Sequence, residues 1–308
     1  MKKVIKIGTR ESQLAVWQAT LVQQLLRDNH IGAELVFIKS EGDVDTITPL
    51  YELGVQGIFT KTLDAALLNK RVDIAVHSLK DVPTTLADGI IQAAVLKRAS
   101  SKDILVYRGD PSFLDDSEGA ATIATSSIRR KAQWLHRYPR HRFENLRGNV
   151  NTRLRKIQEH SWNGAIFAGA GLERINLRPG NSLDLDWMLP APSQGAITIV
   201  CRREDEQSFQ TCHGLEDPDT AMCTTVERDF LRTLKGGCST PISALATIKQ
   251  GTIYLTANIC SPDGRIKIEQ ETSSPVSRYR QIGITTAGDF LKNEQVQSII
   301  RGLRNAEK

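Results

Sequence analysis

Residues 122–138, TIATSSIRRKAQWLHRY, decide the fold class of this chain. TIATSS predicts a short strand, and IRRKAQWLHRY predicts the helix that follows it directly. The same order recurs where VIKIGT (4–9) precedes an apolar-periodic stretch through Leu25, and VDIAVHSL (72–79) reads as a fully buried strand. Such alternation of strands and helices predicts an α/β architecture with mainly parallel sheets.

The character of the sequence changes after about residue 218. Residues 219–234 have the pattern of an amphipathic helix, and TIYLTANICSPDGRIKIEQET (252–272) reads as two alternating strands joined by Ser-Pro-Asp-Gly, a hairpin signal. A helix is expected in the last residues. We therefore expect a small α+β domain at the C-terminus, with PAPSQGAITIVCR (190–202) crossing back between the preceding domains.

Composition bounds the class of protein. The 308 residues are 40% hydrophobic and 24% charged, which is typical of a soluble globular protein of two or three domains. The five cysteines (201, 212, 223, 238 and 260) form no CxxC pair, which argues against a disulfide framework or a structural zinc site and fits a reducing cytoplasm. The apolar run near the N-terminus is too short for a signal peptide or a membrane span.

Arginines recur at strand-to-helix turns, where a cation is mildly unfavourable because the helix N-terminus carries partial positive charge. The turns concerned contain Arg10, Arg129 with Arg130, Arg147 and, one to two turns into the next helix, Arg153. Ligands of open α/β sheets bind at the carboxyl ends of strands, so these cations predict a site for carboxylate or phosphate. The net charge of +5 permits such a ligand without requiring nucleic acid, and no GxxxxGKS loop is present.

Two further segments carry candidate chemistry. HSLKDVP (77–83) places Lys80 beside Asp81 after a buried strand, where the carboxylate could stabilise a cation or simply cap a turn. KGGCSTPIS (235–243) places Cys238 after a glycine pair. The glycines predict a left-handed helix cap, and the cysteine is either a small buried residue or an accessible nucleophile.

Eight segments in one order resemble the porphobilinogen deaminase family, also called hydroxymethylbilane synthase, over nearly the whole chain. They are GTRESQLAVWQA, GIFTKTLDAAL, DIAVHSLKDVPT, TSSIRRKAQ, LRGNVNTRL, AGAGLERI, SQGA and GGCSTPI. The resemblance implies an α/β fold of two periplasmic-binding-protein-like domains plus a small C-terminal α+β domain. The implied boundaries are 1–97 with 196–217 for domain 1, 98–195 for domain 2 and 218–308 for domain 3.

The resemblance also implies an activity. Enzymes of this family condense four porphobilinogen molecules head to tail on a dipyrromethane cofactor, which is joined by a thioether to the cysteine at the position of Cys238. Ammonia and hydroxymethylbilane are released, in tetrapyrrole (haem) biosynthesis. Asp81 is the expected catalytic residue, because its carboxylate would stabilise the positive charge that develops as ammonia leaves. No metal, membrane or nucleic-acid partner is expected, and the implied oligomeric state is a monomer.

The residues that match the family's binding positions form two overlapping sets. The expected cofactor ligands, besides Cys238, are Arg10, Ser12, Lys80, Thr125, Ser126, Ser127, Arg129, Arg130, Arg147, Arg153 and Gly171. The expected substrate ligands are Arg10, Gln18, Phe59, Arg147, Arg153, Arg174 and Gln194.

The chain departs from the family at LYELGVQGIF (50–59), where Glu52 and Gln56 replace lysines and Phe59 is retained. This loss of cations is the best support for an alternative, a non-catalytic receptor for small anions. A cysteine hydrolase that pairs Cys238 with His77 is a poor third hypothesis, because nothing in the sequence orients a base onto the sulfur.

Overall fold

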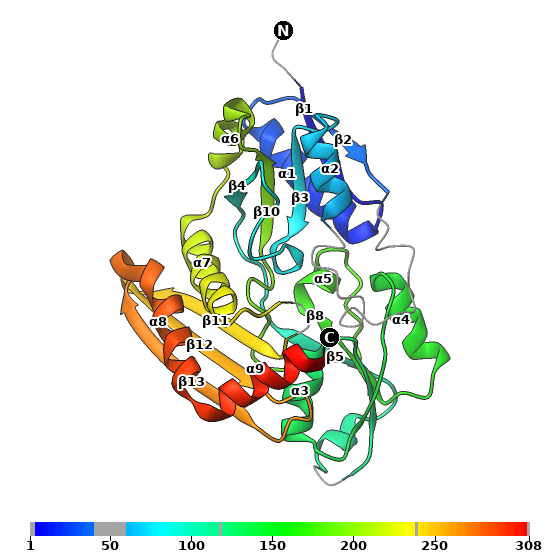
Figure 1. Cartoon of the computed structure of the whole chain (residues 1–308). Coiled ribbons are helices and arrows are strands. Elements are labelled where there is room, and N and C mark those ends of the chain that lie inside the picture. The colour runs from blue at the N-terminus through cyan, green and yellow to red at the C-terminus, as the bar shows by residue number, and fades with distance from the viewer. Residues whose placement is uncertain (1–3, 40–59, 117–118, 238–239, 307–308) are drawn as a thin grey trace.

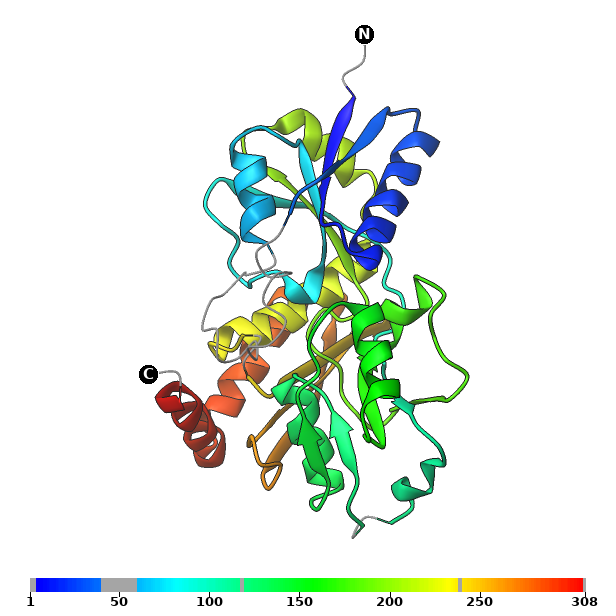
Figure 2. The same cartoon turned by 90° about the vertical axis from the view of Figure 1, so that its right-hand side faces the viewer.

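The computed structural model describes residues 4–39, 60–116, 119–237 and 240–306. This part of the chain forms three sheets, each with its own helices, and Figures 1 and 2 show the three resulting bodies. None of its helices is long and apolar enough to cross a membrane.

The first body surrounds a five-stranded sheet in the order β2-β1-β3-β10-β4. Its strands are β1 (Ile5–Thr9), β2 (Ala33–Phe37), β3 (Ile74–Ser78), β4 (Ile90–Val95) and β10 (Ile197–Arg202). The helices that pack on it are α1 (Gln13–Asp28), α2 (Lys61–Leu68) and α6 (Glu206–His213). Side chains on both faces of β3 are buried, as the apolar run in the sequence predicts.

The second body repeats this plan with the strand order β7-β6-β8-β5-β9. Its strands are β5 (Asp103–Tyr107), β6 (Thr122–Ala124), β7 (Arg142–Glu144), β8 (Gly164–Ala168) and β9 (Ser182–Asp184). Its helices are α3 (Ile128–Arg137), α4 (Val150–Glu159) and α5 (Gly169–Glu173). The strand and helix predicted from residues 122–138 are β6 and α3, and Ser127 caps the helix by accepting a hydrogen bond from Arg130 N at 3.4 Å.

The third body is a three-stranded antiparallel sheet covered by three helices, as expected for a small α+β domain. The strands are β11 (Ile242–Lys249), β12 (Thr252–Cys260) and β13 (Lys267–Pro275), and the predicted hairpin is the β12–β13 pair. The helices are α7 (Pro218–Thr233), α8 (Tyr279–Lys292) and α9 (Glu294–Ala306). Phe230 and Phe290 meet edge to face in its core, with ring centroids 5.1 Å apart.

The α/β class is confirmed, and the prediction of mainly parallel sheets holds for four of the five strands of each large sheet; one strand in each runs the opposite way. Strand β10 runs antiparallel to both β3 and β4, and β5 runs antiparallel to both β8 and β9. The other pairings, β1 with β2 and β3 and β6 with β7 and β8, are parallel. The reason is topological: β5 and β10 each enter their sheet directly from the other body, without the helical crossover that a parallel neighbour requires.

The chain therefore crosses between the first two bodies twice, through residues 96–102 and 185–196, and the two crossing segments are paired. Leu96 N donates to Ile197 O at 2.9 Å, and Ala99 N donates to Gly195 O at 3.1 Å. Gly195 has φ +86°, and a Cβ there would lie 2.6 Å from the Ser100 carbonyl oxygen. Only glycine fits at this crossing.

Candidate active site

The cations predicted at separate turns come together where the first two bodies face each other. Lys80 and Asp81 lie in a short 3-10 helix (Leu79–Asp81) directly after β3, whose end points toward the second body (Figure 1). The charges of Arg129 and Arg130, at the start of α3, act on Lys80, and the charge of Asp81 acts on Arg153 in α4. Residues far apart in the sequence thus share one charged region.

A residue that sequence reasoning missed lies at the centre of this region. Asp103, the first residue of β5, is fully buried and accepts hydrogen bonds from Arg129 Nη2 at 2.7 Å and from Arg130 Nε and Nη2 at 3.0 and 2.7 Å. Burial raises the pKa of this carboxyl, but Arg129, Arg130 and Lys80 outweigh burial and hold the pKa well below its usual range. The available signal was an aspartate opening the apolar run DILVY, immediately after a crossing between domains.

Gln194 connects Asp103 to Lys80. Its Nε2 donates to Asp103 Oδ1 at 2.9 Å and to Ser101 O at 2.8 Å, while its Oε1 accepts from Lys80 Nζ at 3.2 Å. Burial and the two arginines lower the pKa of Lys80 to about 8, against the opposing effect of Asp81 and Asp103. Lys80 is thus a cation that can lose a proton in the physiological range.

Arg147 and Arg153 extend the cationic region into α4 and the turn before it. Arg147 is buried, and Arg153 Nε donates to Gly148 O at 2.7 Å. Burial, followed by repulsion from Arg130 and Arg147, lowers the pKa of Arg153 to about 10, although Asp81 opposes this shift. A guanidinium that is disfavoured in this way would be stabilised by an anionic ligand.

The predicted hydroxyl ligands all have structural roles. Ser12 caps α1 by accepting from Ala15 N at 3.4 Å, and Thr125 Oγ1 accepts from Ser127 N at 3.2 Å. Ser126 Oγ lies 2.7 Å from Leu146 O and accepts from Leu146 N at 3.0 Å, which joins the turn before α3 to the turn before α4. Their contact with a cofactor stays a prediction.

Other predicted ligands lie where α1 of the first body meets α5 of the second. Arg174 Nη2 donates to Gly195 O at 2.6 Å, and its guanidinium lies 5.7 Å from the centre of the Trp17 ring. Gln18 Nε2 donates to Ser78 Oγ at 2.8 Å, next to the segment that carries Lys80. Gly171 faces α1, because a Cβ there would lie 3.7 Å from Leu14 Cδ2.

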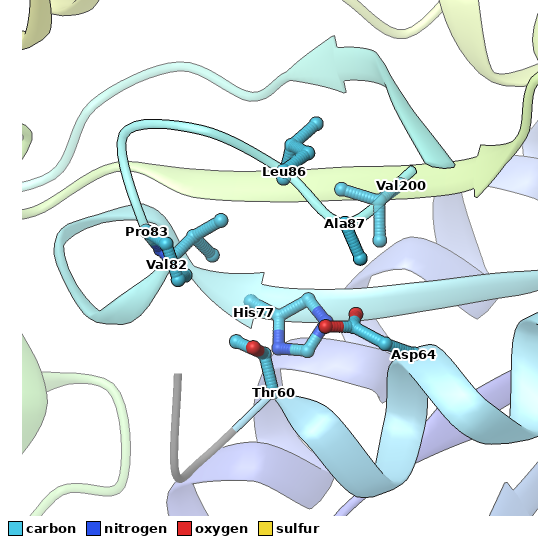
Figure 3. A pocket seen from close by; sticks show the side chains of 8 residues that line it. All are labelled: Thr60, Asp64, His77, Val82, Pro83, Leu86, Ala87 and Val200. Atoms are coloured by element: carbon cyan, nitrogen blue, oxygen red, sulfur yellow. The ribbon is translucent and has the colours of Figure 1, made fainter. Parts of the chain in front are cut away.

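Arg10 follows β1, and its charge acts on His77 in the adjacent β3. The His77 ring lines a small pocket with Thr60, Asp64 and the 82–87 loop, on the α2 side of β3 (Figure 3). Burial and Arg10 lower the pKa of His77 to about 4, so the ring is neutral near pH 7. Among the described residues, Lys80 and Asp81 do not line this pocket.

Cys238, Glu52, Gln56 and Phe59 lie outside the described residues. The chain before Cys238 corrects the expected glycine cap: the left-handed residue after α7 is Lys235, with φ 55°. Gly236 serves packing instead, because a Cβ there would lie 2.6 Å from both Leu231 Cδ1 and Ile242 Cδ1. Close packing, rather than left-handed backbone, is thus what requires glycine at 236.

Comparisons with known protein families assign this chain, and with it the site, to a family. A family model described as "Porphobilinogen deaminase, dipyromethane cofactor binding domain" matches residues 5–210, and "Porphobilinogen deaminase, C-terminal domain" matches residues 221–292. The chain belongs to the porphobilinogen deaminase family. This confirms the resemblance and the predicted dipyrromethane cofactor, and it disfavours the non-catalytic receptor.

Curated relatives agree with the family models over almost the whole chain. The chain is 40% identical over 291 residues to porphobilinogen deaminase of Syntrophotalea carbinolica, a match that covers 93% of this chain and 92% of that one. It is 38% identical over 291 residues to the enzyme of Desulforamulus reducens, with 93% and 94% covered.

Similar chains among solved structures include the following two. The VFT2 domain of Bordetella pertussis BvgS has a TM-score of 0.43 and 14% identity, covering 69% of this chain and 86% of that one. The methionine-binding protein MetQ has a TM-score of 0.42 and 12% identity, covering 68% and 89%.

Proposed function

We propose that the cationic region around Asp81 and Asp103 binds the carboxylates of a dipyrromethane held by Cys238, and of each porphobilinogen added to it. As a hydroxymethylbilane synthase, the chain condenses four porphobilinogen molecules head to tail and releases ammonia and hydroxymethylbilane. The observation that carries the assignment of residues is the interaction of charges across the two bodies: Arg130 of the second body acts on Lys80 of the first, and Asp81 of the first body acts on Arg153 of the second.

The donor set fits the group. Each porphobilinogen-derived ring carries an acetate and a propionate, so two rings bring four negative charges. Among the described residues, the charged side chains that these interactions connect are five cations and two carboxylates, so positive charge is in excess. The cations are Lys80, Arg129, Arg130, Arg147 and Arg153, and the carboxylates are Asp81 and Asp103. The lowered pKa of Arg153 supports this assignment, because a ligand carboxylate would reverse that shift.

When bound, dipyrromethane would supply the free pyrrole α-carbon to which the first ring is joined, and each later ring would join the ring added before it. Asp81 stabilises the positive charge that develops on the incoming ring as ammonia leaves, since a fixed carboxylate in a partly desolvated site acts strongly on charge. The arginines orient the ring through its carboxylates. Lys80, with a pKa of about 8, assists in binding and can hold or release a proton beside Asp81.

The binding roles of Arg10, Gln18, Gly171, Arg174 and Gln194 remain part of the proposal, as do those of the hydroxyls. The position of Gln18, Gly171, Arg174 and Gln194 at the junction of α1, α5 and the crossing segment 185–196 supports contact with a growing chain. We also propose the domain boundaries 1–97 with 196–217, 98–195 and 218–308. We further propose a monomer located in the cytoplasm, where buried free cysteines such as Cys201 and Cys260 would persist.

The deciding experiment is an intact mass of the purified protein beside those of Cys238→Ala and Cys212→Ala. Cys212 is the matched control, because burial raises the pKa of its thiol to about 12 and leaves it a poor nucleophile. We expect an excess of two pyrrole units in the wild type and in Cys212→Ala, and none in Cys238→Ala.

An unmodified wild-type mass that persists after incubation with porphobilinogen or hydroxymethylbilane would overturn the proposal. That result would favour the alternative hypothesis of a non-catalytic receptor for small anions, and Glu52 and Gln56 would then be the first residues to mutate.

A further inference from the structure

Asp103 makes more hydrogen bonds than a single ion pair requires. Its two oxygens accept four hydrogen bonds from three side chains, those of Arg129, Arg130 and Gln194, and the carboxyl is fully buried. A buried carboxylate is costly to desolvate, and it is stable here because each oxygen faces charged donors.

The two arginines depend on this carboxylate. Both are at least nine-tenths buried, and repulsion from Arg130 lowers the pKa of Arg129 after burial has lowered it. Each guanidinium is also tied to the backbone, through Arg129 Nη1 to Leu189 O at 2.8 Å and Arg130 Nη1 to Ile166 O at 3.0 Å. A guanidinium carries five N–H groups, so donors remain on each for a ligand carboxylate.

The same carboxylate fixes the amide of Gln194. Asp103 Oδ1 and Ser101 O both accept from Gln194 Nε2, which leaves Oε1 as the atom that faces Lys80 Nζ. A flipped amide would place its oxygen against two acceptors, so the amide has one favourable orientation. The contact with Lys80 therefore depends on Asp103.

We propose that Asp103 is a positioning residue for the condensation: it holds Arg129 and Arg130 together and, through Gln194, orients Lys80 beside Asp81. This inference rests on the function proposed above. Asp103 reaches the reacting groups only through other side chains. Its place directly after the crossing segment 96–102 makes it the link between the cations of the second body and Lys80 of the first.

The charges around Lys80 predict in which direction its pKa moves when Asp103 is changed. Asp81 and Asp103 raise the pKa of Lys80, whereas burial, Arg130 and Arg129 lower it. Removing the charge of Asp103 removes one raising effect and leaves both arginines, so Asp103→Asn lowers this pKa further. An opposite charge at close range shifts a pKa by about one or more, and we expect a fall of at least about 0.5.

The test compares Asp103→Asn with Asp73→Asn in the full-length protein. Asp73 is the matched control, because it is also a largely buried carboxylate paired with an arginine, Arg202 Nη2 at 3.4 Å, but in the first body away from Lys80. The pKa of Lys80 is measured by competitive acetylation across pH with peptide mass spectrometry. The pH profile of kcat/KM is measured in parallel on the holoenzyme.

We expect Asp103→Asn to lower the Lys80 pKa, to move the alkaline limb of the kcat/KM profile to lower pH and to reduce kcat/KM at least about tenfold. Asp73→Asn should move neither the Lys80 pKa nor the limb. A Lys80 pKa and a limb that match wild type in Asp103→Asn would overturn the inference.

Gln194→Met is the deciding variant if Asp103→Asn folds poorly, because it breaks the bridge between Asp103 and Lys80 and leaves the hydrogen bonds of Arg129 and Arg130 to Asp103 in place. A lowered Lys80 pKa supports the inference, and an unchanged one overturns it. Failure of the proposed function itself would appear separately, as wild-type protein without cofactor or turnover, while the acetylation result would still decide whether Asp103 controls Lys80.

Discussion

Glu227 of α7 is a buried carboxylate whose removal should have a large and specific effect on stability. It is fully buried and accepts from Arg98 Nη1 and Nη2 at 2.8 and 2.7 Å, from Ser193 N at 2.6 Å and from Ala246 N at 2.7 Å. Arg98 and Ser193 belong to the two crossing segments, and Ala246 belongs to β11 of the third body. One side chain thus ties both crossings to the third body.

Glu227→Gln keeps the shape but removes the charge and one acceptor. Arg98 then becomes a largely desolvated cation without its bidentate partner, and one backbone N–H loses its acceptor. Breaking a buried pair from one side costs about 3–5 kcal/mol of unfolding free energy. The pKa of Arg98 is raised by Glu227 despite the opposing effect of burial, which agrees with a strong pair.

Urea denaturation at pH 7 would measure this cost, with Glu159→Gln as a control. Glu159 pairs with Arg155 at 3.2 Å on the surface of α4, and losing such a pair costs about 0.5 kcal/mol or less. Arg98→Met combined with Glu227→Gln should be less destabilised than the sum of the single changes by at least about 1 kcal/mol. A loss below about 1 kcal/mol in Glu227→Gln, or strict additivity, would refute the reasoning.

Three further outcomes can be measured on the same protein. Asp81→Asn should retain fold and cofactor mass but lose about 10²–10³-fold in kcat, and near-normal turnover would remove Asp81 from its role. Arg153→Met should prevent cofactor attachment. In the cofactor-free Cys238→Ala background the same change should stabilise the protein by about 1 kcal/mol in thermal denaturation, because it removes a guanidinium that its neighbours repel. Destabilisation in that background would contradict this reasoning. The pKa of His77 falls to about 4 on folding, so between about pH 6.5 and pH 4 the unfolded state binds a proton that the folded state does not. The free energy of unfolding should therefore fall by roughly 2–3 kcal/mol between pH 7.5 and 4.5. An equal fall in His77→Leu would exclude His77 as the cause.

Local sequence signals predicted the elements of the fold well. The strand and helix of residues 122–138, the buried strand before Lys80 and the C-terminal hairpin all follow from periodicity and turn residues that act within a few positions. Strands β5 and β10 were predicted as strands, but not their reversed direction, because strand direction depends on where the chain arrives from, which local pattern does not encode.

The candidate site was predictable in part, for a related reason. Cations at helix N-termini stand out because they are locally unfavourable, which is why Arg129, Arg130 and Arg153 could be identified from sequence. Asp103 could not, since an aspartate at the start of a strand is locally unremarkable and its role appears only when α3 folds over β5. The left-handed Lys235 was missed because glycine is the usual residue for that conformation.

Helix α7 connects the crossing segments to residues 235–237, which directly precede Cys238. Glu227 anchors it to Arg98 and Ser193. The helix ends at Thr233, and the left-handed Lys235 lies two residues beyond that end and three residues before Cys238. Ser193 adjoins Gln194, which contacts both Asp103 and Lys80. Because packed helices shift as rigid units, a shift of the crossing segments would be transmitted through α7 to residues 235–237. Glu227→Gln should therefore weaken this coupling as well as the fold, and turnover should fall even under conditions where the variant remains folded.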